Sequence, residues 1–130
     1  MNDRAVIDPA LLPGPQERTM LRDSLRAYLE EHWPAAGAVE RARDPAALAA
    51  LWRGLAGQGF AALGADPETG GLRELAIVLE ELGRAAAPAP QVGPALVNLA
   101  LARGAPTTDD EGAARLLSRV QSGDARVALS

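Results

Sequence analysis

The chain has 130 residues, a net charge of −4 and no cysteine, and 48% of its residues are hydrophobic although only 3% are aromatic. This length suits one domain that buries a sizeable core. The acidic balance argues against non-specific binding to nucleic acid or to an anionic membrane, and the lack of cysteine excludes disulfides, a thiolate nucleophile and a cysteine-ligated metal.

The N-terminal segment, MNDRAVIDPALLPGP, has no continuous apolar stretch of the kind found in signal peptides. No apolar run in the chain approaches the ~20 residues of a membrane span. We therefore expect a cytoplasmic protein without a transmembrane segment, in which residues 1–14 form an N-terminal extension.

Two amphipathic helices are predicted in the first half of the chain. The first runs from about Pro15 to Trp33 and is ended by Pro34. The second begins with Asp44 as its N-cap and Pro45 as its first helical residue. We expect their apolar stripes to face the core; these are Leu21, Leu25, Tyr28, His32, Leu29 and Trp33 in the first helix, and Leu48, Leu51, Trp52 and Leu55 in the second.

An irregular connection from Phe60 to Gly71 leads to a third predicted helix, from Leu72 to about Ala86. Its expected core stripe consists of Leu72, Leu75, Leu79, Leu82 and Ala86. Glu80 and Arg84 are four residues apart and can pair. Glu80 and Glu81 are adjacent, so their side chains point about 100° apart and cannot act as a facing acid–base pair. We expect both on a solvated face together with Arg73.

The remaining elements are two further helices and the beginning of a strand. The fourth helix runs from about Val92 to Arg103, and the fifth follows a capping box formed by Thr108 and Glu111 and ends at Gly123. Residues 125–130 are predicted to begin a strand that leads into a β domain. The scarcity of β-branched and aromatic residues disfavours sheets elsewhere. We therefore predict an all-α fold, an orthogonal or up-down bundle of about five helices over residues 15–124.

No catalytic, cofactor-binding or metal-binding residue is predicted within the chain. His32 is the only histidine, and a catalytic or ligand role would need a nearby nucleophile or further ligands. Its place at a helix C-terminus favours a structural role. The glycines between Gly54 and Gly71 follow neither the GxGxxG nor the Walker spacing, so turns and caps explain them.

The fourth helix has an unusual composition, because Asn98 and Arg103 alone interrupt its apolar residues. A helix that is apolar on most sides is buried on most sides. It therefore belongs either to the core or to an apolar ligand pocket or domain interface. Ile77, which lies within the charged face of the third helix, is either an ordinary exposed aliphatic residue or an interface contact.

From Trp52 onward the sequence resembles the acyl-CoA dehydrogenases. The segment LWRGLAGQGFAALGADPETGGL is similar to the stretch in which a tryptophan-bearing helix leads to P-E-x-x-G-G in that family. The segment LRELAIVLEELGRAAAPAP resembles the helix that follows, with its EELGR ending, and SGDARVALS is similar to the strand that leads to the T-E-P motif of the flavin domain. The order and spacing of these segments make the resemblance specific.

The resemblance implies an FAD-dependent α,β-dehydrogenation of an acyl-CoA thioester. A carboxylate base removes the α-proton, and the β-hydrogen leaves as hydride to flavin N5. In the family the base and most FAD contacts belong to the middle and C-terminal domains, so we expect this chain alone neither to bind FAD nor to catalyse the reaction. The expected partners are an acyl-CoA substrate, an electron-transfer flavoprotein as electron acceptor, and further subunits of a homo- or hetero-oligomer.

In that family the N-terminal helical domain packs over the active site and contributes one helix to the acyl-chain pocket. By order along the chain this helix corresponds to the fourth predicted helix. The resemblance therefore implies Leu96, Leu99 and Ala100 of that helix as candidate substrate-binding residues. The resemblance does not specify the acyl group, which is a linear fatty acid, a branched chain or a steroid side chain. The alternative is a non-catalytic subunit or a stand-alone helical module that binds a partner through the fourth helix and Ile77.

Overall fold

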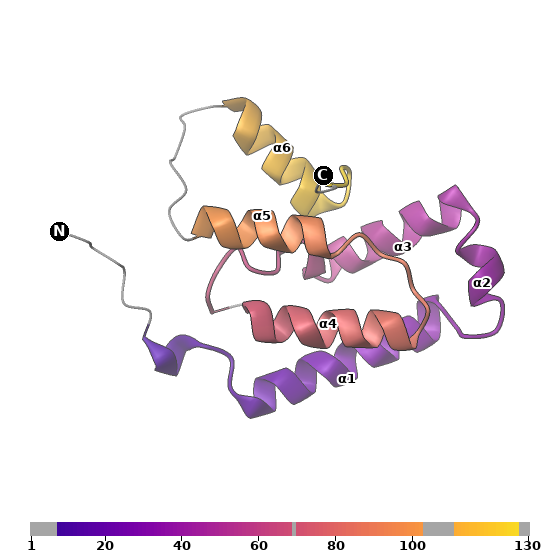
Figure 1. Ribbon diagram of the computed structural model, residues 1–130, viewed down its shortest axis with the longest axis horizontal. Helices are drawn as coiled ribbons and strands as arrows, with labels where there is room; N and C mark the ends of the chain where they lie inside the picture. The colour runs from indigo at the N-terminus through magenta and orange to yellow at the C-terminus, as the bar shows by residue number, and fades with distance from the viewer. Residues whose placement is uncertain (1–7, 69, 103–110, 128–130) are drawn as a thin grey trace.

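The computed structural model describes residues 8–68, 70–102 and 111–127, and this part of the chain contains six α-helices, two short 3-10 helices and no strand (Figure 1). The elements in chain order are η1 (Pro9–Leu11), α1 (Pro15–His32), α2 (Ala38–Arg41), α3 (Pro45–Gly57), η2 (Phe60–Ala62), α4 (Leu72–Arg84), α5 (Val92–Ala102) and α6 (Glu111–Ser122). The predicted all-α fold is confirmed. None of the helices in the described ranges is long and apolar enough to cross a membrane.

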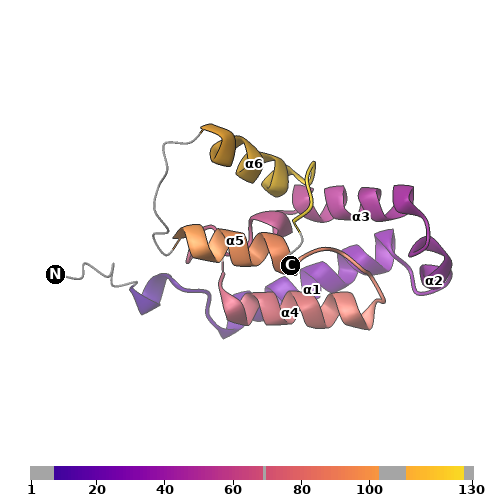
Figure 2. The same ribbon diagram turned by 45° about the horizontal axis from the view of Figure 1, so that its top comes forward.

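The helices are stacked so that α1 and α4 lie side by side and run in the same direction, while α5 returns in the opposite direction (Figures 1 and 2). The short η2 turn lies at the centre of the arrangement, in contact with α3, α5 and α6. The predicted capping residue Thr108 and residues 128–130 of the predicted strand lie outside the described residues. Residues 125–127 form no regular element.

Side chains that accept hydrogen bonds from backbone N–H groups mark the starts of α3 and α1. Asp44 caps α3, because its Oδ1 accepts a hydrogen bond of 3.0 Å from the Ala46 N–H. At the start of α1, the Glu17 carboxylate accepts a hydrogen bond of 3.0 Å from the Gly14 N–H. The single-turn helix α2 was not expected from the sequence, and it places Ala38 in the core with 3% of its surface exposed.

The core is formed by apolar residues of α1, α3, η2 and α4. Its largest members are Leu25, Leu29, Trp33, Leu51, Trp52, Leu55, Phe60, Leu63, Leu75, Val78 and Leu82. Trp52 is 1% exposed, which confirms the prediction that it is a core residue.

The predicted core stripe of α4 is partly wrong. Leu75 and Leu82 are buried, but Leu72 and Leu79 are 58% and 38% exposed, and Ala86 is exposed beyond the end of the helix at Arg84. The helix is rotated relative to the prediction, and Glu81 is buried instead. The reason is the neighbouring helix α1, whose Arg22 and Arg26 pair with Glu81.

Candidate functional site

Helix α5 turns one side to the core and the other outward. Ala95 and Asn98 are each 1% exposed, whereas Val92 and Leu96 are 43% and 38% exposed. Because residues four apart share a helix face, Val92, Leu96 and Ala100 form one outward stripe, which we call the α5 stripe. Ala100 is likewise exposed. Two of the three predicted substrate residues therefore lie on this stripe.

Buried amides determine how α5 is rotated. The Asn98 side-chain amide donates hydrogen bonds to the backbone carbonyls of Ala61 (2.9 Å) and Leu63 (3.1 Å) and accepts one from Gln121 of α6 (3.2 Å). Gln91, just before α5, donates to the Phe60 carbonyl at 2.7 Å. A buried carbonyl without a partner is costly, so the carbonyls of Ala61 and Leu63 need the Asn98 amide. The Phe60 carbonyl also accepts a hydrogen bond of 3.2 Å from the Leu63 N–H. In the sequence Asn98 stands out only as an interruption of an apolar helix, and this lone amide was the available signal for its buried role.

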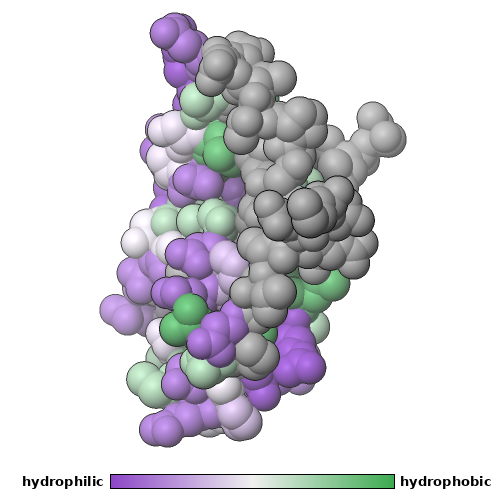
Figure 3. Space-filling view, turned by 90° about the vertical axis from the view of Figure 1, so that its left-hand side faces the viewer, coloured by the Kyte–Doolittle hydropathy of each residue, from purple (hydrophilic) through white to green (hydrophobic). Residues whose placement is uncertain are grey.

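A hollow of about 370 Å³ opens between the N-terminal segment, the connection before α4 and helix α5. We call it the Leu99 pocket, because Leu99 is the one predicted substrate residue that lines it; its volume lies within the range of about 300–1,000 Å³ typical of small-molecule pockets. Its lining consists of Leu12, Pro13, Gly64, Pro67, Gly70, Gly71, Leu72, Arg73, Glu74 and Leu99. Figure 3 views the end of the molecule where α1 and α4 begin, and hydrophobic residues there form separate patches among hydrophilic ones.

Two glycines shape the pocket through close approach of the backbone. Gly64 has a φ of +89°, and a Cβ atom there would lie 2.8 Å from Cγ of Leu99 and 3.1 Å from the Ala95 carbonyl oxygen. Gly70 has a φ of +137°, and a Cβ atom there would meet Cβ of Glu74 at 2.8 Å. Larger residues would be strained at both positions. The connection can therefore lie directly on α5 and hold Leu99 in the pocket wall.

The N-terminus of α4 is occupied by its own carboxylate. Glu74 is 5% exposed, and its Oε2 accepts a hydrogen bond of 2.8 Å from the Gly71 N–H. Helix N-termini are common binding sites for the phosphates of dinucleotides, yet Glu74, Glu17 and Asp44 occupy the starts of α4, α1 and α3. A negatively charged pyrophosphate would be repelled there. These three helix starts thus do not fit the phosphates of FAD.

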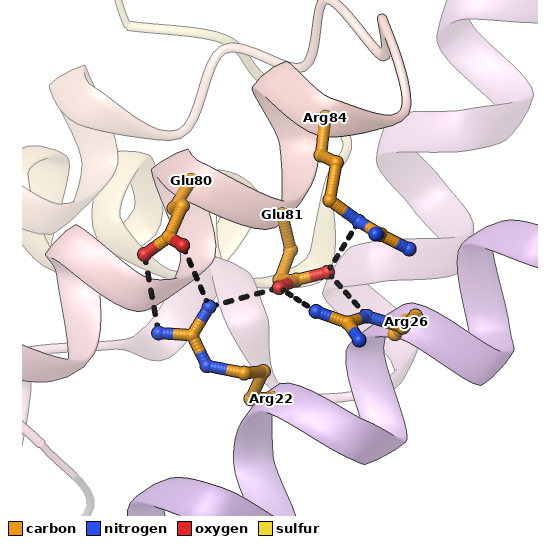
Figure 4. Close-up of polar contacts among 5 residues, drawn as sticks. All are labelled: Arg22, Arg26, Glu80, Glu81 and Arg84. Carbon is orange, nitrogen blue, oxygen red and sulfur yellow. Dashed lines mark hydrogen bonds and ion pairs between the residues drawn. The ribbon is translucent and has the colours of Figure 1, made fainter.

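The strongest electrostatic feature is a cluster of five charged side chains between α1 and α4 (Figure 4). Glu81 is 1% exposed, and Arg26 binds its two carboxylate oxygens at 2.8 and 3.0 Å. Arg22 reaches Glu81 at 2.9 Å and Glu80 at 3.0 Å, and Nε of Arg84 lies 3.5 Å from Glu81. The hydrogen bonds from Arg26, followed by those from Arg22, lower the pKa of Glu81 to about 2.

This cluster corrects two predictions. Glu81 is buried rather than solvated, because α1 supplies the arginines that a buried carboxylate needs. Glu80 pairs with Arg22 of α1 rather than with Arg84 of its own helix, and the hydrogen bond from Arg22 lowers the Glu80 pKa. A carboxylate held ionised by several arginines is a poor proton acceptor, so the cluster joins the two helices and does not act in acid–base chemistry.

The other side chains that stood out in the sequence, His32 and Ile77, have surroundings that indicate a structural role. His32 is exposed, so the predicted core stripe of α1 does not extend to it. Its ring is stacked on Tyr28 at 4.1 Å between centroids, and its Nδ1 lies 3.0 Å from the Tyr28 carbonyl oxygen. Ile77 is half-buried. Within the described ranges, no group of His, Asp and Glu side chains could hold a metal ion. A second, more open hollow of about 630 Å³ lies beside the N-terminal segment and includes Leu11 and Met20.

Residues 15–124 match the family model described as acyl-CoA dehydrogenase, N-terminal domain. The acyl-CoA dehydrogenase IpdE2 of Mycobacterium tuberculosis is 43% identical over 93 residues, which cover 67% of this chain and 29% of that protein. The protein of the same name from Mycolicibacterium smegmatis is 41% identical over 96 residues, covering 66% of this chain and 30% of that protein. The chain thus spans less than a third of the length of these curated relatives. No solved structure matches it.

Proposed function

The chain belongs to the acyl-CoA dehydrogenase family as its N-terminal domain, and from this premise we propose that it shapes the acyl-chain pocket of a flavin-dependent acyl-CoA dehydrogenase. The reaction would be the α,β-dehydrogenation of an acyl-CoA thioester. FAD and the carboxylate base would be held by other domains, which is consistent with the carboxylates at the starts of α1, α3 and α4. An electron-transfer flavoprotein would accept the electrons.

The observation that supports this proposal most is the surface of α5. Val92 and Leu96 are 43% and 38% exposed on a helix whose other side is buried. Exposed apolar stripes of this kind are covered by a ligand or by another domain in many proteins. Leu99, at the edge of the α5 stripe, lines the Leu99 pocket. An acyl chain in contact with Leu96, Leu99 and Ala100 would cover apolar side chains that the described residues leave exposed or half-buried.

In such an enzyme these residues would determine which acyl group fits and would leave the chemical step unchanged. The reason is that apolar contacts discriminate by size, and each methylene contact changes kcat/KM by roughly 10- to 200-fold. If the α5 stripe instead contacted a subunit or a neighbouring domain, its residues would not make kcat/KM depend on acyl length. A non-catalytic or interaction role is therefore distinguished from the proposed one by the dependence on acyl length.

The test is to introduce Ala100→Leu into the acyl-CoA dehydrogenase that carries this domain. We expect kcat/KM for a long acyl-CoA to fall about 10-fold or more relative to a short one, with flavin content unchanged. Ala27→Leu is the matched control, because Ala27 is an exposed alanine on α1. An equal loss for both substrates at normal flavin content would refute the pocket role of α5.

A further inference from the structure

Part of the wall of the Leu99 pocket is formed by residues that precede the family match. Leu12 and Pro13 line it from the N-terminal segment, whereas the match begins at residue 15. Leu12 is 43% exposed and does not belong to the hydrophobic core. The segment therefore adds apolar surface to a pocket that is otherwise built by the helical domain.

The position of this wall is determined by α1. Nη1 of Arg18 donates a hydrogen bond of 2.8 Å to the Pro13 carbonyl oxygen, and the Gly14 N–H donates to Glu17 at 3.0 Å. Upstream, the η1 turn is closed by a hydrogen bond of 3.0 Å from the Leu11 N–H to the Asp8 carbonyl. The bond from Arg18 thus ties the backbone next to Leu12 to α1, and the η1 turn fixes only the local shape of the segment before it.

Two parts of the wall have little freedom to change the pocket's size. Leu99 is packed against Gly64, and the Glu74 carboxylate is engaged by the Gly71 N–H. Leu12 and Leu72 also line the pocket and are 43% and 58% exposed, so their side chains can be changed without disturbing the core. Open space is available beside Gly71, where a Cβ atom would meet no atom within 4 Å. A larger side chain at position 12 would therefore reduce the space that a ligand can fill.

We propose that Leu12 is a specificity-determining residue, which limits the length or bulk of the acyl group that the Leu99 pocket admits. The inference rests on the proposed function, because it takes the occupant of the pocket to be an acyl chain. It assigns a role in substrate selection to the segment that precedes the family domain.

The experiment uses the acyl-CoA dehydrogenase that carries this domain and measures kcat/KM for butyryl-CoA and dodecanoyl-CoA. Leu12→Trp should lower kcat/KM for dodecanoyl-CoA about 10-fold or more and leave that for butyryl-CoA within about twofold. Leu12→Ala should not lower kcat/KM for dodecanoyl-CoA. Leu11→Trp is the matched control, because Leu11 is 54% exposed on the same segment and does not line the Leu99 pocket.

The proposal is overturned if Leu12→Trp affects both ligands alike or neither of them, or if Leu11→Trp has the same selective effect. Ala100→Leu in the same assay separates this failure from a failure of the proposed function. If Ala100→Leu discriminates by acyl length and Leu12→Trp does not, α5 lines the acyl site and the N-terminal segment has no part in it. If neither variant discriminates, the acyl-pocket role of the domain falls as well.

Discussion

Polar side chains are buried in two contacts of this protein, one between α1 and α4 and one between α5 and η2. The two contacts supply different hydrogen-bond partners for them. Each buries polar side chains at a helix surface and leaves large apolar residues of that helix exposed. Between α1 and α4 the buried group is the Glu81 carboxylate, which is paired with arginines. Between α5 and η2 the buried groups are the neutral amides of Asn98 and Gln91, which are paired with backbone carbonyls.

The difference follows from what each helix faces. Helix α4 faces another regular helix, whose backbone groups are already paired, so a buried polar group there must meet side chains. Helix α5 faces an irregular connection, in which the carbonyls of Ala61 and Leu63 accept hydrogen bonds from the Asn98 amide. The first contact therefore depends on ionisation and the second does not, and variants of the two should respond differently to pH.

The largest expected effect comes from the apolar part of the α1–α4 contact. Leu82→Ala should lower the free energy of unfolding by about 2–5 kcal/mol, because a buried leucine is replaced by a cavity. Leu82 is 4% exposed, whereas Leu79 on the same helix is 38% exposed. Leu79→Ala should therefore cost clearly less. Urea denaturation of the two variants measures both, and equal midpoint shifts would mean that the observed rotation of α4 is wrong.

The next effect concerns the charge of Glu81. Glu81→Gln should lower the free energy of unfolding near pH 7 by about 1–3 kcal/mol, because charge-assisted hydrogen bonds become neutral ones. The arginines of the cluster are themselves partly exposed and stay hydrated, which limits the loss.

The same residue predicts a pH dependence. The pKa of Glu81 is lowered from 4.5 to about 2 in the folded protein, so the unfolded state binds more protons between these values. Its contribution is present above pH 4.5 and is lost as the pH falls toward 2. Urea midpoints of the wild type and Glu81→Gln should therefore converge over this range. A difference that stays constant with pH would contradict the role of the carboxylate charge.

The smallest effect is expected for the amide contact. Gln121→Ala removes one hydrogen bond of 3.2 Å to Asn98 and should cost about 0.5–1.5 kcal/mol. The cost should be the same at pH 4 and pH 7, because neither amide titrates. Gln16→Ala, at an exposed position of α1, provides the control. A loss that varied with pH would show that this contact is coupled to the charged cluster.

Much of the fold could be predicted because its signals are local. Asp44 and Pro45 define the start of α3 through a cap and a fixed φ angle, and the expected bounds of α1 and the expected start of α3 agree with the structure. Trp52 lies in the core as its helical spacing indicated. The turn α2 carried too weak a signal, because four residues cannot show a helical period.

The candidate site could be predicted only in outline. The helix that contains Leu96, Leu99 and Ala100 was recognised by its composition, but an apolar pattern on nearly every side does not indicate which side faces inward. Leu12 gave no signal at all, because it belongs to no periodic element and reaches the Leu99 pocket only through the fold.

The sequence by itself determined the helical class, the helix starts and the family, since caps, prolines, apolar spacing and ordered motifs depend on neighbours along the chain. The tertiary structure decided the faces of α4 and α5. Their rotation depends on partners distant in sequence: Arg22 and Arg26 for Glu81, and the carbonyls of Ala61 and Leu63 for Asn98. A polar residue is buried only where such a partner meets it, because burial without one costs several kcal/mol.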